Sequence, residues 1–294
     1  MDIEALYREY KPLLFRVAYR LLGSASDAED AVQDAFVALQ QSPQQTIEHP
    51  KAYLARAVTN HALNKMKSAQ RKRETYVGPW LPEPVLSEPY PADADPALTF
   101  ERQEQYGYAW MVMLEKLSAP ERAVFVLRET LQYDYAELAE MLDRTEAACR
   151  KLYSRAKSKL EELPEPAATR AGEGEAFVRA FTEAARNGSF EPLIGLLTDD
   201  ATLISDGGGK ARAALRPIRG KERVLVFFRG IRSKGSLDGE LRALRINGQL
   251  GLLWLRQGKT PLLLTYGPAP GTGINALFLV SNPDKLKGAE LFLP

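Results

Sequence analysis

Hydrophobic residues recur at every third or fourth position through most of residues 1–75, a spacing that predicts helices with one buried face each. Ser26 and Glu29 have the spacing of a capping box and predict the start of one helix. Its apolar face comprises Ala28, Val32, Ala35, Phe36 and Leu39. Pro50 suits the first turn of the next helix. The predicted buried stripe of that helix comprises Leu54, Ala57, Val58, His61 and Ala62. The first block is therefore expected to be all helical.

A second helical block follows and contains a short break. Helices are predicted over residues 120–131, 133–142 and 145–163. Asp143 lies at the second break, where a short turn needs a residue that tolerates positive φ. This is a helix-turn-helix signature, in which the third helix presents side chains to a major groove. The candidate readers are Thr145, Glu146, Ala148, Arg150, Lys151 and Arg155. An ordinary three-helix bundle with a solvated basic face is the alternative.

The hydrophobic period changes in the last third of the chain. Amphipathic helices are predicted over 175–188 and 220–231. Strands are predicted over 201–205, 239–246, 249–256, 261–267 and 275–280. Asn247-Gly248 between two of these strands is a hairpin signal. The pattern predicts an α+β domain with a curved sheet.

Proline-rich and polar stretches separate these blocks. Residues 74–102 hold six prolines and six acids against one base, which favours an extended linker. The expected organisation is multidomain: a helical domain over 1–75, a linker over 76–102, a helix-turn-helix domain over 103–163, a linker over 164–174 and the α+β domain over 175–294.

Charge is segregated along the first block although the whole chain has a formal net charge of only +1. Residues 51–73 carry seven Lys or Arg and no acid, whereas residues 1–50 carry eight acids and four bases. One face of the basic helix carries Arg56, Asn60, Asn64, Lys67 and Arg71. Amides, together with the rings of Tyr53 and Tyr76 nearby, can bind unstacked bases, which favours nucleic acid over a merely solvated face. Asp27, Asp30 and Asp34 gather on the preceding helix and suit a basic partner.

Several kinds of site are disfavoured by composition. A single cysteine, Cys149, excludes an intramolecular disulfide and a cysteine-cluster zinc site, and it is expected to be a small buried residue. The sequence contains no apolar run of about 18 residues, so it predicts no membrane span. We expect a soluble cytoplasmic protein with no metal and no cofactor.

Three segments together resemble regions two and four of the extracytoplasmic-function sigma factors of bacterial RNA polymerase. They cover residues 27–39, 49–74 and 117–160, in the order and distance of that family. The resemblance implies that core RNA polymerase and promoter DNA are the partners. It implies docking on the polymerase clamp helices through Asp27, Asp30, Gln33, Asp34 and Phe36. The stripe from Arg56 to Arg71 would bind and melt the minus-ten element, and the helix with Thr145 to Arg155 would read the minus-thirty-five element. Leu152 departs from the family pattern, because many such recognition helices carry a basic residue at this position.

Three shorter motifs resemble a sigma subgroup with a fused C-terminal SnoaL-like domain. They are WLPEP at 80–84, DGGGK at 206–210 and NPDKL at 282–286. The regulatory contact expected from this resemblance comprises Trp80, Leu81, Pro82, Glu83, Pro84, Asp206, Gly207, Gly208, Gly209, Lys210, Asn282, Pro283, Asp284, Lys285 and Leu286. Trp80 is the expected bulky anchor, and the domain is expected to modulate sigma activity in cis.

Two alternatives stay open from the sequence. One is a helix-turn-helix repressor that acts without polymerase and binds an unknown small-molecule ligand in its third domain. The other is a DNA-binding protein fused to an isomerase or cyclase, for which Asp206 is the candidate general base. The third domain has no histidine and no cysteine. Because three glycines follow Asp206, we expect it to lie in a mobile loop rather than in a rigid pocket. The chain is therefore not expected to be an enzyme.

Overall fold

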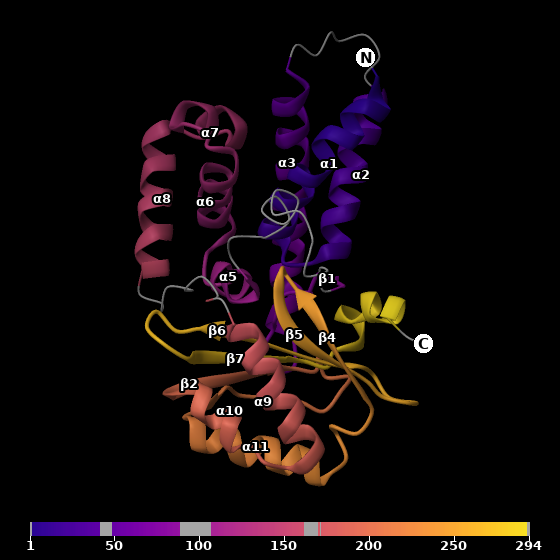
Figure 1. Ribbon diagram of the computed structural model, residues 1–294. Coiled ribbons are helices and arrows are strands. Elements are labelled where there is room, and N and C mark those ends of the chain that lie inside the picture. Colours follow the sequence, from indigo (N-terminus) through magenta and orange to yellow (C-terminus); the bar gives the residue numbers. More distant parts are fainter. Residues whose placement is uncertain (1, 42–48, 89–106, 162–169, 171, 293–294) are drawn as a thin grey trace. The chain divides into compact units, whose positions relative to one another are not determined.

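The computed structural model describes residues 2–41, 49–88, 107–161, 170 and 172–292, and the side chains of residues 69–74 are outside this description (Figure 1). The chain forms two compact units. The first unit comprises residues 1–75 and 113–163, and the second comprises 76–112 and 164–294. The described part of the predicted linker, residues 76–88, therefore belongs to the second unit rather than standing between domains.

The first unit begins with three helices. They are α1 (Ile3–Leu22), α2 (Ala25–Gln41) and α3 (Pro50–Glu74). Pro50 opens α3 as predicted, but α2 starts before the predicted capping box, because the Ser24 hydroxyl accepts from the backbone N–H of Asp27 at 3.2 Å. The buried face of α3 comprises Leu54, Ala55, Val58, Thr59 and Ala62. His61 was predicted in that stripe and is only half-buried.

The helix-turn-helix is present in the same unit. Its helices are α6 (Ala119–Leu131), α7 (Tyr135–Leu142) and α8 (Glu146–Glu161). Asp143 has a φ of +52°, as the short turn requires, and the buried Cys149 packs inside, as predicted. Arg122 is 1% exposed, pairs with Glu115, and donates from Nε to the Arg20 carbonyl at 2.6 Å, so α6 is tied to α1.

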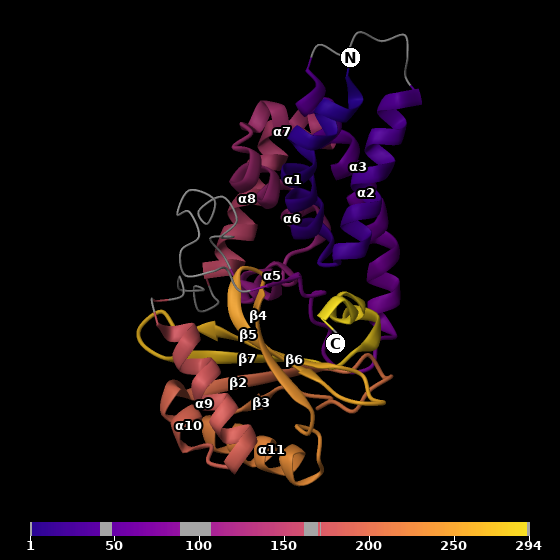
Figure 2. The same cartoon turned by 45° about the vertical axis from the view of Figure 1, so that its right-hand side comes forward.

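The second unit is built on a seven-stranded mixed sheet with strand order β1-β4-β5-β6-β7-β2-β3 (Figures 1 and 2). The strands are β1 (Leu86–Ser87), β2 (Leu197–Asp206), β3 (Ile218–Arg219), β4 (Glu240–Ile246), β5 (Gln249–Leu255), β6 (Leu262–Pro268) and β7 (Ile274–Val280). Only β2 and β7 pair in parallel. Asn247 and Gly248 have φ of +50° and +79° in the predicted hairpin. The two-residue strands β1 and β3 were not predicted.

Each face of this sheet has its own hydrophobic core. One face packs against α9 (Glu173–Asn187), α10 (Glu191–Leu196) and α11 (Lys221–Ser233). Aromatic side chains fill that layer: Phe177, Phe181, Phe190, Phe228 and Trp254 are all at most 1% exposed. The other face is covered by Leu81, by the start of α5 (Tyr108–Leu114) and by the C-terminal 3-10 turns Pro283–Lys285 and Lys287–Phe292. The α+β domain is confirmed, and its core also contains Leu81, Tyr108 and Ala109, which precede the predicted domain in the sequence.

Candidate functional site

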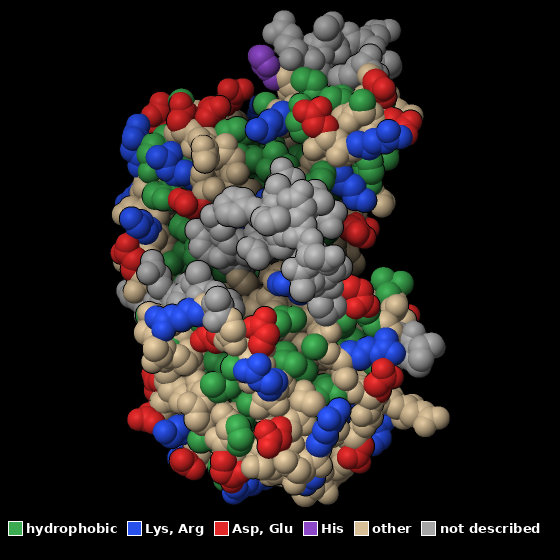
Figure 3. Space-filling view, in the orientation of Figure 1, with side chains coloured by type: hydrophobic (Ala, Val, Ile, Leu, Met, Phe, Trp, Pro, Cys, Tyr) green, Lys and Arg blue, Asp and Glu red, His purple; other side chains and the backbone are tan. Residues whose placement is uncertain are grey.

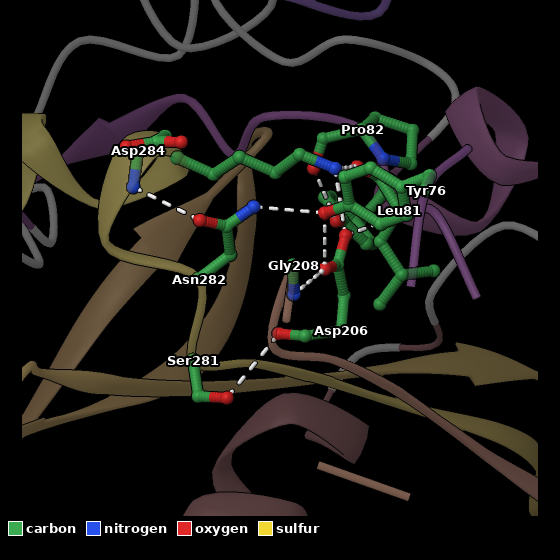
Figure 4. A network of polar contacts seen from close by, with 10 residues as sticks. Tyr76, Leu81, Pro82, Asp206, Gly208, Ser281, Asn282 and Asp284 are labelled. Carbon is green, nitrogen blue, oxygen red and sulfur yellow. Dashed lines mark hydrogen bonds and ion pairs between the residues drawn. The ribbon is translucent and has the colours of Figure 1, made fainter. Parts of the chain in front are cut away.

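Asp206, at the end of β2, is completely buried, and its carboxylate accepts four hydrogen bonds (Figure 4). Its Oδ1 accepts from the Tyr76 hydroxyl at 2.5 Å and from the Gly208 N–H at 3.0 Å. Its Oδ2 accepts from the Leu81 N–H at 2.8 Å and from Lys285 Nζ at 2.6 Å. We call Asp206 and these four donors the Asp206 network. Two of the donors come from residues 76–81, more than a hundred positions earlier in the chain.

Lys285 supplies the positive charge of the network. Its side chain is 10% exposed, and Nζ also donates to the Leu81 carbonyl. The ammonium lies 4.0 Å from the ring centroid of Trp80 and 5.0 Å from that of Tyr76, which are cation–π distances. A buried lysine is tolerated here because one carboxylate, one carbonyl and two rings surround it.

Asn282 locks the NPDKL turn onto the network. Its Nδ2 donates to the Tyr76 hydroxyl at 2.8 Å, and its Oδ1 accepts from the Asp284 N–H at 3.0 Å, which caps the 3-10 turn. Lys210 pairs with Asp284 at 2.6 Å on the exposed side. The DGGGK and NPDKL motifs therefore meet.

The glycines of DGGGK fit this close approach. Gly208 has a φ of +60°, and a Cβ there would lie 2.3 Å from Asn282 Nδ2. A Cβ on Gly207 would lie 2.2 Å from the Ala211 carbonyl oxygen. The expectation of a mobile loop around Asp206 is wrong, since its carboxylate is buried and has four donors.

Leu81, not Trp80, is the buried anchor of the WLPEP motif. Leu81 is 0% exposed in the sheet core, whereas Trp80 is half-buried under the Lys285 ammonium. Pro82 and Pro84 are buried and Glu83 is half-buried. The Pro82 carbonyl accepts from the Tyr108 hydroxyl at 2.6 Å. The predicted contact between the motif and the third domain exists, but its deepest residue differs.

Tyr76 has a different role from the one its sequence position indicated. Burial, and then the hydrogen bond to the Asp206 carboxylate, raise the pKa of its hydroxyl. Tyr76 belongs to the second unit, where its hydroxyl donates to Asp206 and accepts from Asn282. Tyr53 stays on α3 and is half-buried.

The acidic residues of α2 are partly neutralised by α3. Lys65 Nζ lies 2.9 Å from Asp27 Oδ1 and 3.1 Å from Asp30 Oδ2. Burial lowers the pKa of Lys65, but its bonds to these two carboxylates outweigh this and raise the pKa overall. Asp34 lies 3.5 Å from His61 Nδ1. Sequence reasoning missed Lys65 because it counted the lysine as part of the basic segment alone.

Two other predicted docking residues differ in exposure. Gln33 is exposed beside the acidic residues. Phe36 is only 6% exposed, and its ring packs against Tyr7 with centroids 5.0 Å apart. Phe36 is therefore a core residue of α2 in this structure rather than a surface contact.

The predicted minus-ten stripe lies on the solvent side of α3. Arg56, Asn60, Asn64 and Lys67 are exposed, and the side chain of Arg71 is outside the described part. Arg56 Nη1 lies 3.7 Å from Glu140 Oε1 on α7. On the face shown in Figure 3, acidic and basic side chains are interspersed on each unit.

The predicted reading residues lie at the start of α8. Thr145 caps the helix, since its Oγ1 accepts from the Ala148 N–H at 3.2 Å. Glu146 pairs with Arg150 at 2.9 Å. Lys151 and Arg155 are exposed. Leu152 and Ala148 are half-buried.

Family models assign a class to the two helical segments. The model described as Sigma-70 region 2 matches residues 6–72, and the model described as Sigma-70, region 4 matches residues 109–160. The fold and the two matches together define a sigma-type transcription initiation factor.

Relatives narrow that class. The chain is 35% identical over 292 residues to the ECF RNA polymerase sigma factor SigJ of Mycobacterium tuberculosis, covering 95% of this chain and 91% of the relative. It is 29% identical over 199 residues to a probable ECF RNA polymerase sigma factor, SigI, of the same species, covering 66% of this chain and 67% of the relative. The crystal structure of the M. tuberculosis SigJ protein aligns with a TM-score of 0.75 and 32% identity over 96% of this chain and 98% of that chain. The chain belongs to the extracytoplasmic-function RNA polymerase sigma factors, a family that binds core polymerase and promoter DNA.

No described helix is long and apolar enough to cross a membrane. Within the same residues, no group of three or more His, Cys, Asp or Glu side chains is arranged to hold a metal ion.

Proposed function

We propose that this chain binds core RNA polymerase, directs initiation at its promoters, and is modulated in cis by its second unit. Family membership supports the first two parts. The proposed docking residues are Asp27, Asp30, Gln33 and Asp34, which lie on the accessible side of α2. The proposed minus-ten residues are Arg56, Asn60, Asn64, Lys67 and Arg71 on α3. The proposed minus-thirty-five residues are Thr145, Glu146, Ala148, Arg150, Lys151 and Arg155 at the start of α8.

The observation that carries the cis modulation is that both described ends of the connection between the two sigma regions belong to the second unit. The start is held by the Asp206 network and by β1, whose Leu86 pairs with Ile246 of β4. The end is held by Tyr108 and Ala109, which pack in the same sheet core as Leu81. The second unit therefore holds both described ends of the segment that links the proposed minus-ten residues to the proposed minus-thirty-five residues.

Buried charge makes this restraint strong and sensitive to single substitutions. Removing one partner from a buried ion pair leaves the other charge uncompensated, at a cost of roughly 3–5 kcal/mol. A change at Asp206 or Lys285 would therefore release residues 76–81 without touching a DNA-binding residue.

We propose no catalytic role for Asp206. An ionised carboxylate has about four lone-pair sites, and four donors of the protein occupy them. The helix-covered face of the sheet supports the same reading, because buried aromatic rings fill its core. The hypothesis of a small-molecule ligand in this domain gains no support from the described residues.

Run-off transcription tests the sigma function. Core polymerase with and without the protein transcribes fragmented genomic DNA of the encoding organism, and sequencing of RNA 5′ ends maps the start sites. We expect new start sites that share two sequence elements. A protein that binds core but adds no start site would contradict the proposal.

The docking surface is tested separately by core binding. The triple change of Asp27, Asp30 and Asp34 to Asn should weaken binding to core and reduce its salt dependence, because these charges complement a basic partner. Glu29 to Gln, an exposed acid on the same helix, is the matched control. Equal loss in the triple variant and the control would contradict the proposed surface.

A further inference from the structure

An aromatic ring of the helix-turn-helix lies beside an arginine of the recognition helix. The Arg150 guanidinium is 4.5 Å from the ring centroid of Tyr135, the first residue of α7. Arg150 is also paired with Glu146 one turn earlier on α8. The Arg150 side chain is 60% exposed, so it stays accessible while these two groups limit where its guanidinium can lie.

The Tyr135 ring is itself held from two other helices. The Arg128 guanidinium of α6 lies 4.2 Å from the Tyr135 centroid, and its Nη1 donates to the Tyr133 carbonyl at 3.1 Å. The Tyr153 ring of α8 meets Tyr135 edge-on with centroids 6.2 Å apart. The Tyr153 hydroxyl donates to Glu129 at 2.6 Å. The ring is therefore a fixed surface rather than a freely rotating side chain.

We propose that Tyr135 is a positioning residue for promoter reading: its ring holds the Arg150 guanidinium in place for the minus-thirty-five element. The inference rests on the proposed function, in which α8 reads DNA. A long arginine side chain loses rotamer entropy when it contacts a base, and a side chain already held in one region loses less. The ring retains full positive charge on Arg150, since a π-face attracts the cation without neutralising it.

The ring and the ion pair have different consequences for DNA binding. An exposed Arg–Glu pair at i, i+4 contributes little to stability and must loosen when Arg150 turns to a base. The ring can keep its contact while the guanidinium edge donates to guanine O6 and N7, because stacking uses the face and hydrogen bonding uses the edge. We therefore expect Tyr135 to increase discrimination between base pairs more than it increases the overall affinity for DNA.

Two substitutions separate a ring effect from a hydroxyl effect. Tyr135→Leu removes the π-face and keeps an apolar side chain, whereas Tyr135→Phe keeps the face and should restore the wild-type behaviour. Thermal unfolding of each variant shows whether the helix-turn-helix remains folded. The Nε–Hε signal of Arg150 in the full chain, assigned with Arg150→Lys, reports the position of the guanidinium in the absence of DNA.

Binding is measured on duplexes that carry the mapped minus-thirty-five element and each of its single-base-pair changes, with the holoenzyme. We expect Tyr135→Leu to shift the Arg150 signal and to lower discrimination by about 2–5-fold at the base pair that Arg150→Ala also affects. The double variant should discriminate no worse than Arg150→Ala. An unchanged Arg150 signal, or a uniform loss of affinity for every duplex, would overturn the inference.

Failure of the proposed function gives a different pattern. If Arg150→Ala changes no base preference while Lys151→Ala or Arg155→Ala does, α8 reads DNA without Arg150, and only the positioning role of Tyr135 is overturned. If none of the three α8 variants changes binding to the element, α8 does not read it and the proposed function of this helix fails.

Discussion

Asp206→Asn is predicted to destabilise the second unit, because the substitution removes a buried charge without changing side-chain size. Asn presents one oxygen and one NH2 group where the carboxylate presents two oxygens. Each carboxylate oxygen accepts from two donors, so either orientation of Asn turns an NH2 group toward two of them. Lys285, whose side chain is 10% exposed, also loses the charge of its Asp206 partner.

The magnitude follows from burial. Breaking a buried ion pair by removal of one partner costs roughly 3–5 kcal/mol. The matched control is Asp284→Asn, whose carboxylate pairs with Lys210 while both side chains are more than half exposed. That pair contributes about 0–1 kcal/mol. For a domain of 150–250 residues, the Asp206 variant should therefore lower Tm by roughly 6–20 °C, and the control by a few degrees at most.

Tryptophan fluorescence isolates the second unit in this assay. All three tryptophans, Trp80, Trp110 and Trp254, lie in residues assigned to that unit. Urea unfolding followed at this signal should show the lower midpoint for Asp206→Asn. If the two variants unfold within about 1 kcal/mol of each other, the buried network does not hold the second unit in the way that its geometry indicates.

Three further outcomes are expected. Leu81→Ala should destabilise the second unit by about 2–5 kcal/mol in urea unfolding, and Trp80→Ala by less, because only Leu81 is fully buried. Arg122→Ala should destabilise the first unit by roughly 3–5 kcal/mol by circular dichroism, since Glu115, whose side chain is only 12% exposed, loses the charge of Arg122. Burial, and then a hydrogen bond to a carboxylate, raise the pKa of Tyr153 to about 12. The neutral hydroxyl thus stabilises the fold fully below pH 10, and this contribution is lost as pH rises toward 12; Tyr153→Phe should remove that part of the alkaline destabilisation. Alkaline destabilisation of Tyr153→Phe equal to that of the wild type would refute the pH prediction. Equal losses of unfolding free energy in Leu81→Ala and Trp80→Ala would refute the first prediction.

Elements determined by neighbouring residues could be predicted from the sequence. The positive φ of Asp143 follows from a two-residue break between helical patterns, and the Asn247-Gly248 hairpin follows from residues that accept left-handed conformations. The start of α2 was predicted at Ser26, but the Ser24 hydroxyl accepts from the first turn instead, because the cap depends on how the chain passes from α1 to α2.

The site needed contacts that sequence spacing does not report. Asp206 looked like part of a mobile glycine loop because three of its bonding partners, Tyr76, Leu81 and Lys285, lie far from it in the chain. Trp80 was predicted to be the anchor because its side chain is larger. In the structure Leu81 is completely buried in the sheet core, whereas the Trp80 ring packs against the Lys285 ammonium. The family resemblance predicted that the three motifs act together, but their contacts could be described only from the folded structure.

Transcription from a mapped promoter tests the central claim most directly. Reconstituted holoenzyme with wild-type protein, Asp206→Asn, Trp80→Ala or the Asp284→Asn control is compared at equal occupancy of core and below the unfolding temperature. We expect Asp206→Asn to change transcript yield by at least about fivefold, the lower end of typical coupling between sites, while the control matches wild type. Equal yields from all four proteins would contradict modulation by the second unit, and no promoter-dependent transcript from any of them would contradict the sigma function itself.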